Sequence, residues 1–333
     1  MMPIRLIDFY THASSLKYVD FVELHERKPF FFRAQYERLK TLTKCKERLD
    51  LLDRNGVDVH VLVPMPFLES FPRIFNDVAL AREGARLIND EVAEFVAREP
   101  KRFKGVAVLP TVRPDVMVAE LEHAVKELGF VGACCAVGPT CKRMDHPDME
   151  HLYRAIVDLD ATLWLHPMRP PLPEYVDEET SQFGAWNTIG WLYDTTSAMY
   201  RIVFAGVFDR YRGIRIVTHH HGALLPAHSW RLNVQWSKAE AQYPTKISKP
   251  YIEHFKNFHC DTAVFGYAPK VLELALEFFG PNHVLFGSDS PFDVDDGQHF
   301  TKETLRSIDG MAIPPDVRSG IRSGNATRIL KMA

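Results

Sequence analysis

The sequence predicts an α/β protein whose strands close into a distorted (β/α)₈ TIM barrel, and three observations support this fold class. Short apolar runs alternate with longer amphipathic segments along the 333 residues. The runs are apolar almost throughout, as in strands buried on both faces of a parallel sheet. The phosphate loops GxGxxG and GxxxxGK[ST], which an open doubly wound sheet usually carries, do not occur in the sequence. We expect a single barrel domain spanning residues 1–333.

Eight strands are expected, each a short run enriched in β-branched or other apolar residues. In chain order they are Ile4–Tyr10, Val57–Val63, Gly105–Leu109, Gly132–Cys135, Thr162–His166, Ile214–His219, Asn257–Asp261 and His283–Gly287.

Helical patterns lie between most of these strands. In Asn76–Arg98, apolar residues such as Ala81 and Ala85 recur at helical spacing and therefore share one face. Asp115–Leu128 is a second such segment, and Gly129 follows it at a position where helices commonly end.

Two long insertions interrupt this alternation, after the first and the fifth strand. They are Ala13–Lys44, which contains three consecutive phenylalanines, and Met168–Gly190, which contains Trp186. Both leave the C-terminal end of a strand, where barrel active sites lie. We expect a lid or a dimer contact from them rather than a separate domain.

Composition excludes several classes of protein. The net charge is −3 and basic residues alternate with acidic ones, so a nucleic-acid surface is not expected. No apolar run reaches the ~20 residues of a membrane helix, and no signal peptide is visible. The odd number of cysteines, without CxxC, predicts free thiols and a cytoplasmic location. They are Cys45, Cys134, Cys135, Cys141 and Cys260.

Polar residues gather where four of the expected strands end. His12, His166 and His219 follow the first, fifth and sixth strands, and Asp289 follows the eighth. Each alone could be a hydrogen-bonded loop residue or a helix cap. Together they are the imidazole and carboxylate ligands that a catalytic divalent ion needs, with Zn²⁺ expected first and Mn²⁺ or Fe²⁺ also suited.

Several motifs, taken in order, resemble the amidohydrolase superfamily, in particular the branch of aminocarboxymuconate-semialdehyde decarboxylase and γ-resorcylate decarboxylase. The resemblance runs nearly end to end. The segments that carry it are Leu52–Val57, Pro100–Gly105, Lys126–Phe130, Leu165–Pro167, Leu285–Phe292 and Gly324–Ala326.

The resemblance implies a role for each strand-end residue. His12 matches the second histidine of the family's HxH motif, His166 and Asp289 match further metal ligands, and His219 matches the catalytic histidine. His220 and His221 fall where relatives often have glycine. A place beside the site and a purely structural role in the loop both stay open for them.

Tyr10 departs from the family pattern, because it occupies the first position of HxH. A neutral phenol is a poor ligand for a divalent ion unless the metal deprotonates it. Two interpretations stay open: Tyr10 hydrogen-bonds a substrate carboxylate or a metal-bound water, or it is an aromatic residue that packs at the barrel mouth.

Two arginines are candidates for binding an acidic substrate, since guanidinium binds carboxylate through paired hydrogen bonds. By resemblance, Arg48 matches the family's substrate-carboxylate arginine. Arg231 matches an arginine that reaches the site of a neighbouring subunit, which implies a homodimer. A surface ion pair is the alternative for both.

Three functions follow. The first is a metal-dependent, non-oxidative decarboxylase of an aromatic or unsaturated carboxylic acid, with Asp289 or His219 supplying the proton that replaces CO₂. The second uses the same ligands to hydrolyse a lactone, ester or amide, as other members of the superfamily do. The third is a binding protein that has lost its metal through Tyr10.

Overall fold

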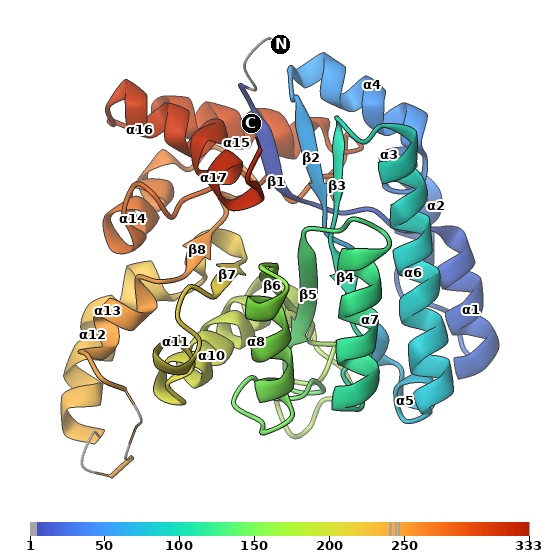
Figure 1. Cartoon of the computed structure of the whole chain (residues 1–333), viewed down its shortest axis with the longest axis horizontal. Coiled ribbons are helices and arrows are strands. Elements are labelled where there is room, and N and C mark those ends of the chain that lie inside the picture. The colour runs from blue at the N-terminus through green and yellow to red at the C-terminus, as the bar shows by residue number, and fades with distance from the viewer. Residues whose placement is uncertain (1–4, 240–241, 244, 246, 333) are drawn as a thin grey trace.

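The computed structural model describes residues 5–239, 242–243, 245 and 247–332. Its strands lie at the centre of the molecule and its longer helices lie around them (Figure 1). The strands are β1 (Ile7–Thr11), β2 (Val59–Leu62), β3 (Phe103–Gly105), β4 (Ala107–Val108), β5 (Gly132–Val137), β6 (Thr162–Pro167), β7 (Arg215–Thr218) and β8 (His259–Cys260).

All strand pairs are parallel, in the orders β1-β2-β3 and β4-β5-β6-β7-β8. The segment 283–289 links the two outer strands. Leu285 N donates to Cys260 O in β8, and Phe9 N in β1 donates to Phe286 O. These hydrogen bonds complete a ring of parallel segments, which is the predicted α/β architecture.

The structure corrects two of the expected strands. The third, Gly105–Leu109, is divided at Val106, because the chain pairs with β2 before this residue and with β5 after it. The eighth, His283–Gly287, forms only an isolated bridge at Val284 and is not a regular strand. The remaining six lie within three residues of their predicted bounds, although Ile4, the expected start of the first, lies outside the described residues.

Helices follow most strands. They are α1 (Leu16–Glu26), α2 (Arg33–Arg38), α3 (Lys40–Thr43), α4 (Cys45–Asn55), α5 (Pro72–Phe75), α6 (Val78–Arg98), α7 (Pro114–Lys126), α8 (Met149–Asp158), α9 (Ala185–Thr188), α10 (Gly190–Phe204), α11 (Val207–Arg210), α12 (Leu225–Ala239), α13 (Tyr251–Phe255), α14 (Pro269–Phe279), α15 (Gln298–Gly310), α16 (Pro315–Ser319) and α17 (Asn325–Leu330). Short turns of other helical types lie at Leu68–Ser70, His220–Gly222 and Gly320–Gly324.

The two predicted helical segments are confirmed as α6 and α7. The carboxylate of Asp77 accepts hydrogen bonds from the first free backbone N–H groups of α6, which fixes its start. Gly129 has a φ of +68° just after α7, a conformation that glycine adopts without steric cost. No helix in the described part of the chain is long and apolar enough to span a membrane.

Side chains alternate across β6 and so fix the direction of the site. Leu163 and Leu165 pack in the large cluster between strands and helices, whereas Trp164 packs inside the ring against Phe9. Because the side-chain period of a strand is two, His166 points inward, like Trp164. The ring interior below the site is therefore filled by apolar side chains, as in other barrels.

Candidate metal and substrate site

The four predicted strand-end residues lie together at one mouth of the ring. The ring centroids of His12 and His166 are 5.1 Å apart, and those of His166 and His219 are 5.3 Å apart. Ligand atoms of His12, His166 and His219 lie within 4.8 Å of one another, and so do those of His219, His220 and Asp289. This convergence comes from strands that are far apart in the sequence.

His12 and His166 are held in the form that binds a metal. Each places its Nδ1 2.7 Å from a backbone carbonyl oxygen, of Val63 and Pro167 respectively. A carbonyl only accepts hydrogen bonds, so each Nδ1 donates, and each Nε2 is left facing the cluster, where its lone pair could bind a metal. Burial, and the neighbouring His12, lower the pKa of His166 well below 6.5, which keeps it neutral.

Asp289 supplies the negative charge of the cluster. Its Oδ1 lies 2.7 Å from His12 Nε2 and 3.2 Å from His219 Nε2. Burial alone would raise the pKa of Asp289, but the charge of His219 and hydrogen bonds with its neighbours lower it well below 3.8. A cation held by both His12 Nε2 and the Asp289 carboxylate would take the place of the proton between them, so the donor set fits a divalent ion.

The backbone fixes Asp289 in place. Its N–H donates to Tyr10 O at 3.0 Å, and its φ is +65°, which is uncommon for a residue other than glycine. Just before it, Gly287 passes so close to β1 that a Cβ would lie 2.9 Å from that of Tyr10. Only glycine fits this approach, and it lets Asp289 lie beside His12.

His219 is oriented by a second carboxylate. Its Nδ1 is hydrogen-bonded to Asp261, whose other oxygen accepts the N–H groups of His221 and Ala263. Burial would lower the pKa of His219, but the charges of Asp261 and Asp289 outweigh it and raise the pKa to about 9. A carboxylate paired with a histidine in this way fixes the orientation of the ring.

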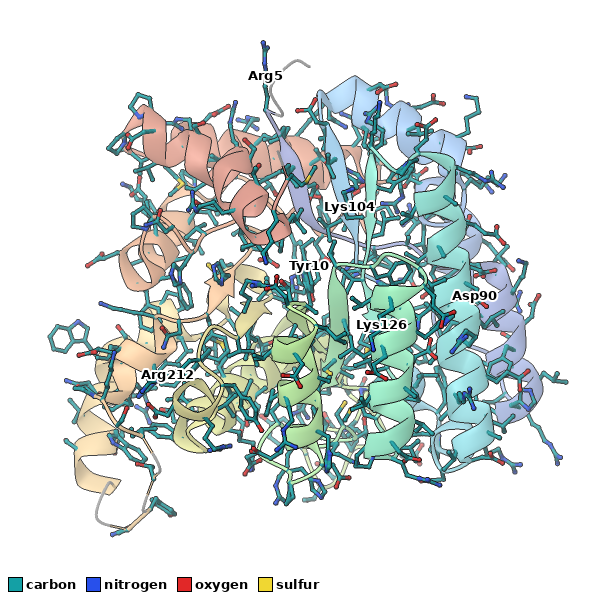
Figure 2. The ribbon with its side chains drawn as sticks, in the orientation of Figure 1. Arg5, Tyr10, Asp90, Lys104, Lys126 and Arg212 are labelled. Atoms are coloured by element: carbon teal, nitrogen blue, oxygen red, sulfur yellow. The ribbon has the colours of Figure 1, made fainter. Side chains whose placement is uncertain are left out.

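Tyr10 lies beneath the cluster and not in it. Its ring stacks on that of His219, with centroids 3.8 Å apart, and its hydroxyl donates to Leu165 O at 2.9 Å. The side chain is fully buried near the middle of the molecule (Figure 2). Of the two interpretations of Tyr10, the geometry favours aromatic packing.

A cavity of about 480 Å³ opens above the cluster. Its lining is His12, Phe32, Gln35, Arg38, Met65, His166, Asn187, Thr188, Trp191, Leu192, His220, His221, Ala263, Val264, Phe265, Asp289, Phe292 and Phe300. We call His12, His166 and Asp289 its floor. We call Phe32, Gln35, Arg38, Trp191 and Phe292 its wall.

The structure brings His220 and His221 to the cavity, where sequence reasoning left their place open. Both have a φ near +50°, in the left-handed region. His220 packs on His219 and its Nε2 lies 3.8 Å from Asp289 Oδ2. By contrast, His219 is not part of the lining and lies behind Asp289 as seen from the cavity.

The two predicted arginines do not line the cavity. Arg48 is fully buried, and its guanidinium donates to the backbone oxygens of Thr41 and His12 and contacts His60. Its side-chain hydrogen bonds are therefore made to groups of the protein outside the cavity. Arg231 is exposed on α12 and lines a separate hollow beside His228.

Sequence reasoning missed the wall residues Gln35, Arg38 and Trp191. Gln35 and Arg38 lie on α2 within the long connection after β1, and Trp191 lies in the first turn of α10, after the connection that follows β6. Both connections leave strand ends near the site, which was the one available signal. No periodicity marks the individual residues.

Comparisons with known proteins agree with this geometry. The sequence matches the Amidohydrolase family over residues 43–332. It is 31% identical to γ-resorcylate decarboxylase of Polaromonas sp. strain JS666 over 310 residues, which cover 89% of this chain and 90% of that one.

Two solved structures share the fold. The 5-carboxyvanillate decarboxylase of Sphingomonas paucimobilis matches with a TM-score of 0.85 and 25% identity, over 99% of this chain and 100% of that one. The dihydroxybenzoic acid decarboxylase of Polaromonas sp. JS666, with bound manganese and 2-nitroresorcinol, matches with a TM-score of 0.80 and 27% identity, over 98% and 97%. The fold, the extent of the match and the similarity to these relatives agree, and the chain belongs to the amidohydrolase family.

Proposed function

We propose that this protein is a metal-dependent, non-oxidative decarboxylase of an aromatic carboxylic acid. One observation carries the proposal: two histidine lone pairs and a carboxylate converge at the base of a cavity with aromatic walls. The relatives named above, one of them more than 30% identical over most of both chains, are decarboxylases of aromatic acids. This favours decarboxylation over the hydrolysis that the sequence left open.

His12, His166 and Asp289 would hold the metal. When bound, a divalent ion there would fix oxygen atoms of the acid and draw electrons from the ring. Zinc was the first expectation from the ligand types, but the manganese in the Polaromonas relative makes Mn²⁺ the first ion to test. Arg48 would act through His12, because it donates a hydrogen bond to the backbone oxygen of that residue.

The reaction needs a proton. When the bond between the ring and the carboxylate breaks, CO₂ leaves, the electron pair stays on the ring carbon, and a proton must take its place. Asp289 lines the cavity and contacts His219 on its far side. We propose that His219, which Asp261 keeps in position, passes a proton to Asp289, that Asp289 delivers it to the ring carbon, and that solvent then returns a proton to His219.

The wider organisation follows from the same proposal. We propose one barrel domain over residues 1–333, in which the connections 13–44 and 168–190 are insertions that shape the cavity. We also propose a homodimer in which α12 carries Arg231 to the partner's site. Trp230, the neighbour of Arg231 in the sequence, has an exposed fraction of 80%. A tryptophan this exposed supports a partner subunit that covers this face.

Product analysis tests the proposal. Chelator-treated protein would be reloaded with Mn²⁺, Zn²⁺ or Fe²⁺ and incubated with hydroxylated benzoic acids. We expect CO₂ and the decarboxylated ring in equal amounts, and only with metal. A hydrolysed product without CO₂ would instead support the hydrolase, and failure to take up any ion would support the binding protein.

A further inference from the structure

One arginine does line the cavity, and it is Arg38, at the end of α2. Among the residues that the structure describes, it is the one lysine or arginine in the lining. Arg38, and neither Arg48 nor Arg231, is therefore the cationic side chain that could contact an acidic substrate in the cavity.

Arg38 lacks a counterion in the described part of the protein. Its one hydrogen bond runs from Nη2 to the backbone oxygen of Asp293, at 3.1 Å. Arg33, on the same helix, forms ion pairs with Asp20, Glu23 and Glu37. A guanidinium that keeps most of its N–H groups free beside a cavity is suited to bind an anion through paired hydrogen bonds.

Arg38 is exposed, but the loop that it contacts is ordered. The carboxylate of Asp293 accepts backbone N–H groups of Asp295, Gly297 and Phe300, so the loop that contacts Arg38 is itself ordered by hydrogen bonds. Three residues after Arg38, Thr41 is hydrogen-bonded to Asp296 of the same loop. The hydrogen bond to this loop therefore directs one N–H group of Arg38, and the others stay available to an anion.

Charge balance indicates what the partner is. Counted formally, a divalent ion and the Arg38 guanidinium bring three positive charges to the cavity, and the Asp289 carboxylate offsets one. Two positive charges remain, which favours an anionic ligand in the cavity.

We propose that Arg38 binds a second anionic group of the substrate, so that the preferred substrates are aromatic acids carrying two negative charges. The reacting carboxylate lies at the floor, and the second carboxylate or ionised phenol reaches Arg38. Arg38 is thus a residue that determines specificity. This inference rests on the proposed function, in which an aromatic acid occupies the cavity.

Binding measurements test it without turnover. Benzene-1,3-dicarboxylate and benzoate would be titrated into manganese-loaded protein by calorimetry, for the wild type and for Arg38→Gln, Arg38→Lys and the matched helix control Arg33→Gln. We expect Arg38→Gln to weaken the dicarboxylate by about 10- to 100-fold and benzoate by less than threefold or so. Arg38→Lys should recover part of the loss, and Arg33→Gln should bind as the wild type does.

Manganese content and melting temperature are measured for each variant, so that a change in fold is recognised. Equal affinity of wild type and Arg38→Gln for the dicarboxylate would overturn the inference, and so would an equal loss for both acids. Arg38-dependent binding without CO₂ release from any acid would support the inference and count against the decarboxylase alone.

Discussion

The floor and the wall of the cavity are built in different ways. The floor residues His12, His166 and Asp289 are almost completely buried, lie at the ends of the parallel segments of the ring and are held by hydrogen bonds. The wall residues come from α2, from α10 and from loops, and they are partly or largely exposed. From this difference we expect the ring to fix the chemistry and the long connections to select the substrate.

Loss of a floor residue should have the largest effect. His166→Ala removes a ligand lone pair and leaves nothing in its place, so we expect loss of the bound metal and at least about a 100-fold fall in kcat/KM. Metal content by mass spectrometry and the rate of CO₂ release measure this. His123→Ala, on the outer helix α7, is the matched control and should keep both. A metal-replete, active His166→Ala protein would remove the distinction between floor and wall.

A change in the wall should alter binding more than chemistry. The ring of Phe292 lies 5.4 Å from that of His12 and covers one side of the cavity. Phe292→Ala removes apolar contact with the substrate, so we expect KM to rise about 10-fold with kcat changed by less than about threefold. The fully exposed Phe183 supplies the control Phe183→Ala. A fall in kcat with KM unchanged would place Phe292 functionally with the floor.

The smallest effect on activity is expected beneath the floor. Tyr10→Phe keeps the ring stacked on His219 but leaves the buried oxygen of Leu165 without its donor. We expect the free energy of unfolding to fall by about 1–3 kcal/mol, with metal content and kcat nearly unchanged. Chemical denaturation and metal analysis test this, and loss of the metal would show that the hydroxyl belongs to the ligand set.

The sequence predicted the ring and the gathering of its strand-end residues because both depend on local patterns. Apolar runs mark strands, and a residue just after a strand must lie at the mouth. The pattern did not show that the segment around Val284 pairs too briefly to form a regular strand. Nor did it show the direction of Arg48, which hydrogen bonds to Thr41 and His12 decide.

Arg38 was missed for a similar reason. It lies in a helix of six residues, too short to show a hydrophobic period, and its place depends on a loop 255 residues further along the chain. Contacts between residues so far apart in the chain produce no local sequence pattern. The length of a connection and the strand end from which it leaves can therefore indicate that it contributes to the site. They do not give a role to any single residue in it.

The pairing of His12 with Asp289 joins positions 277 residues apart. During synthesis, His12 and His166 are added to the chain long before Asp289. The growing chain therefore contains the two imidazoles of the floor before it contains the carboxylate. Capture of the ion should then coincide with closure of the ring, among the last events of folding. An ion held by both residues would link the first and last segments of the ring, so its release should accompany the first opening of the barrel during unfolding.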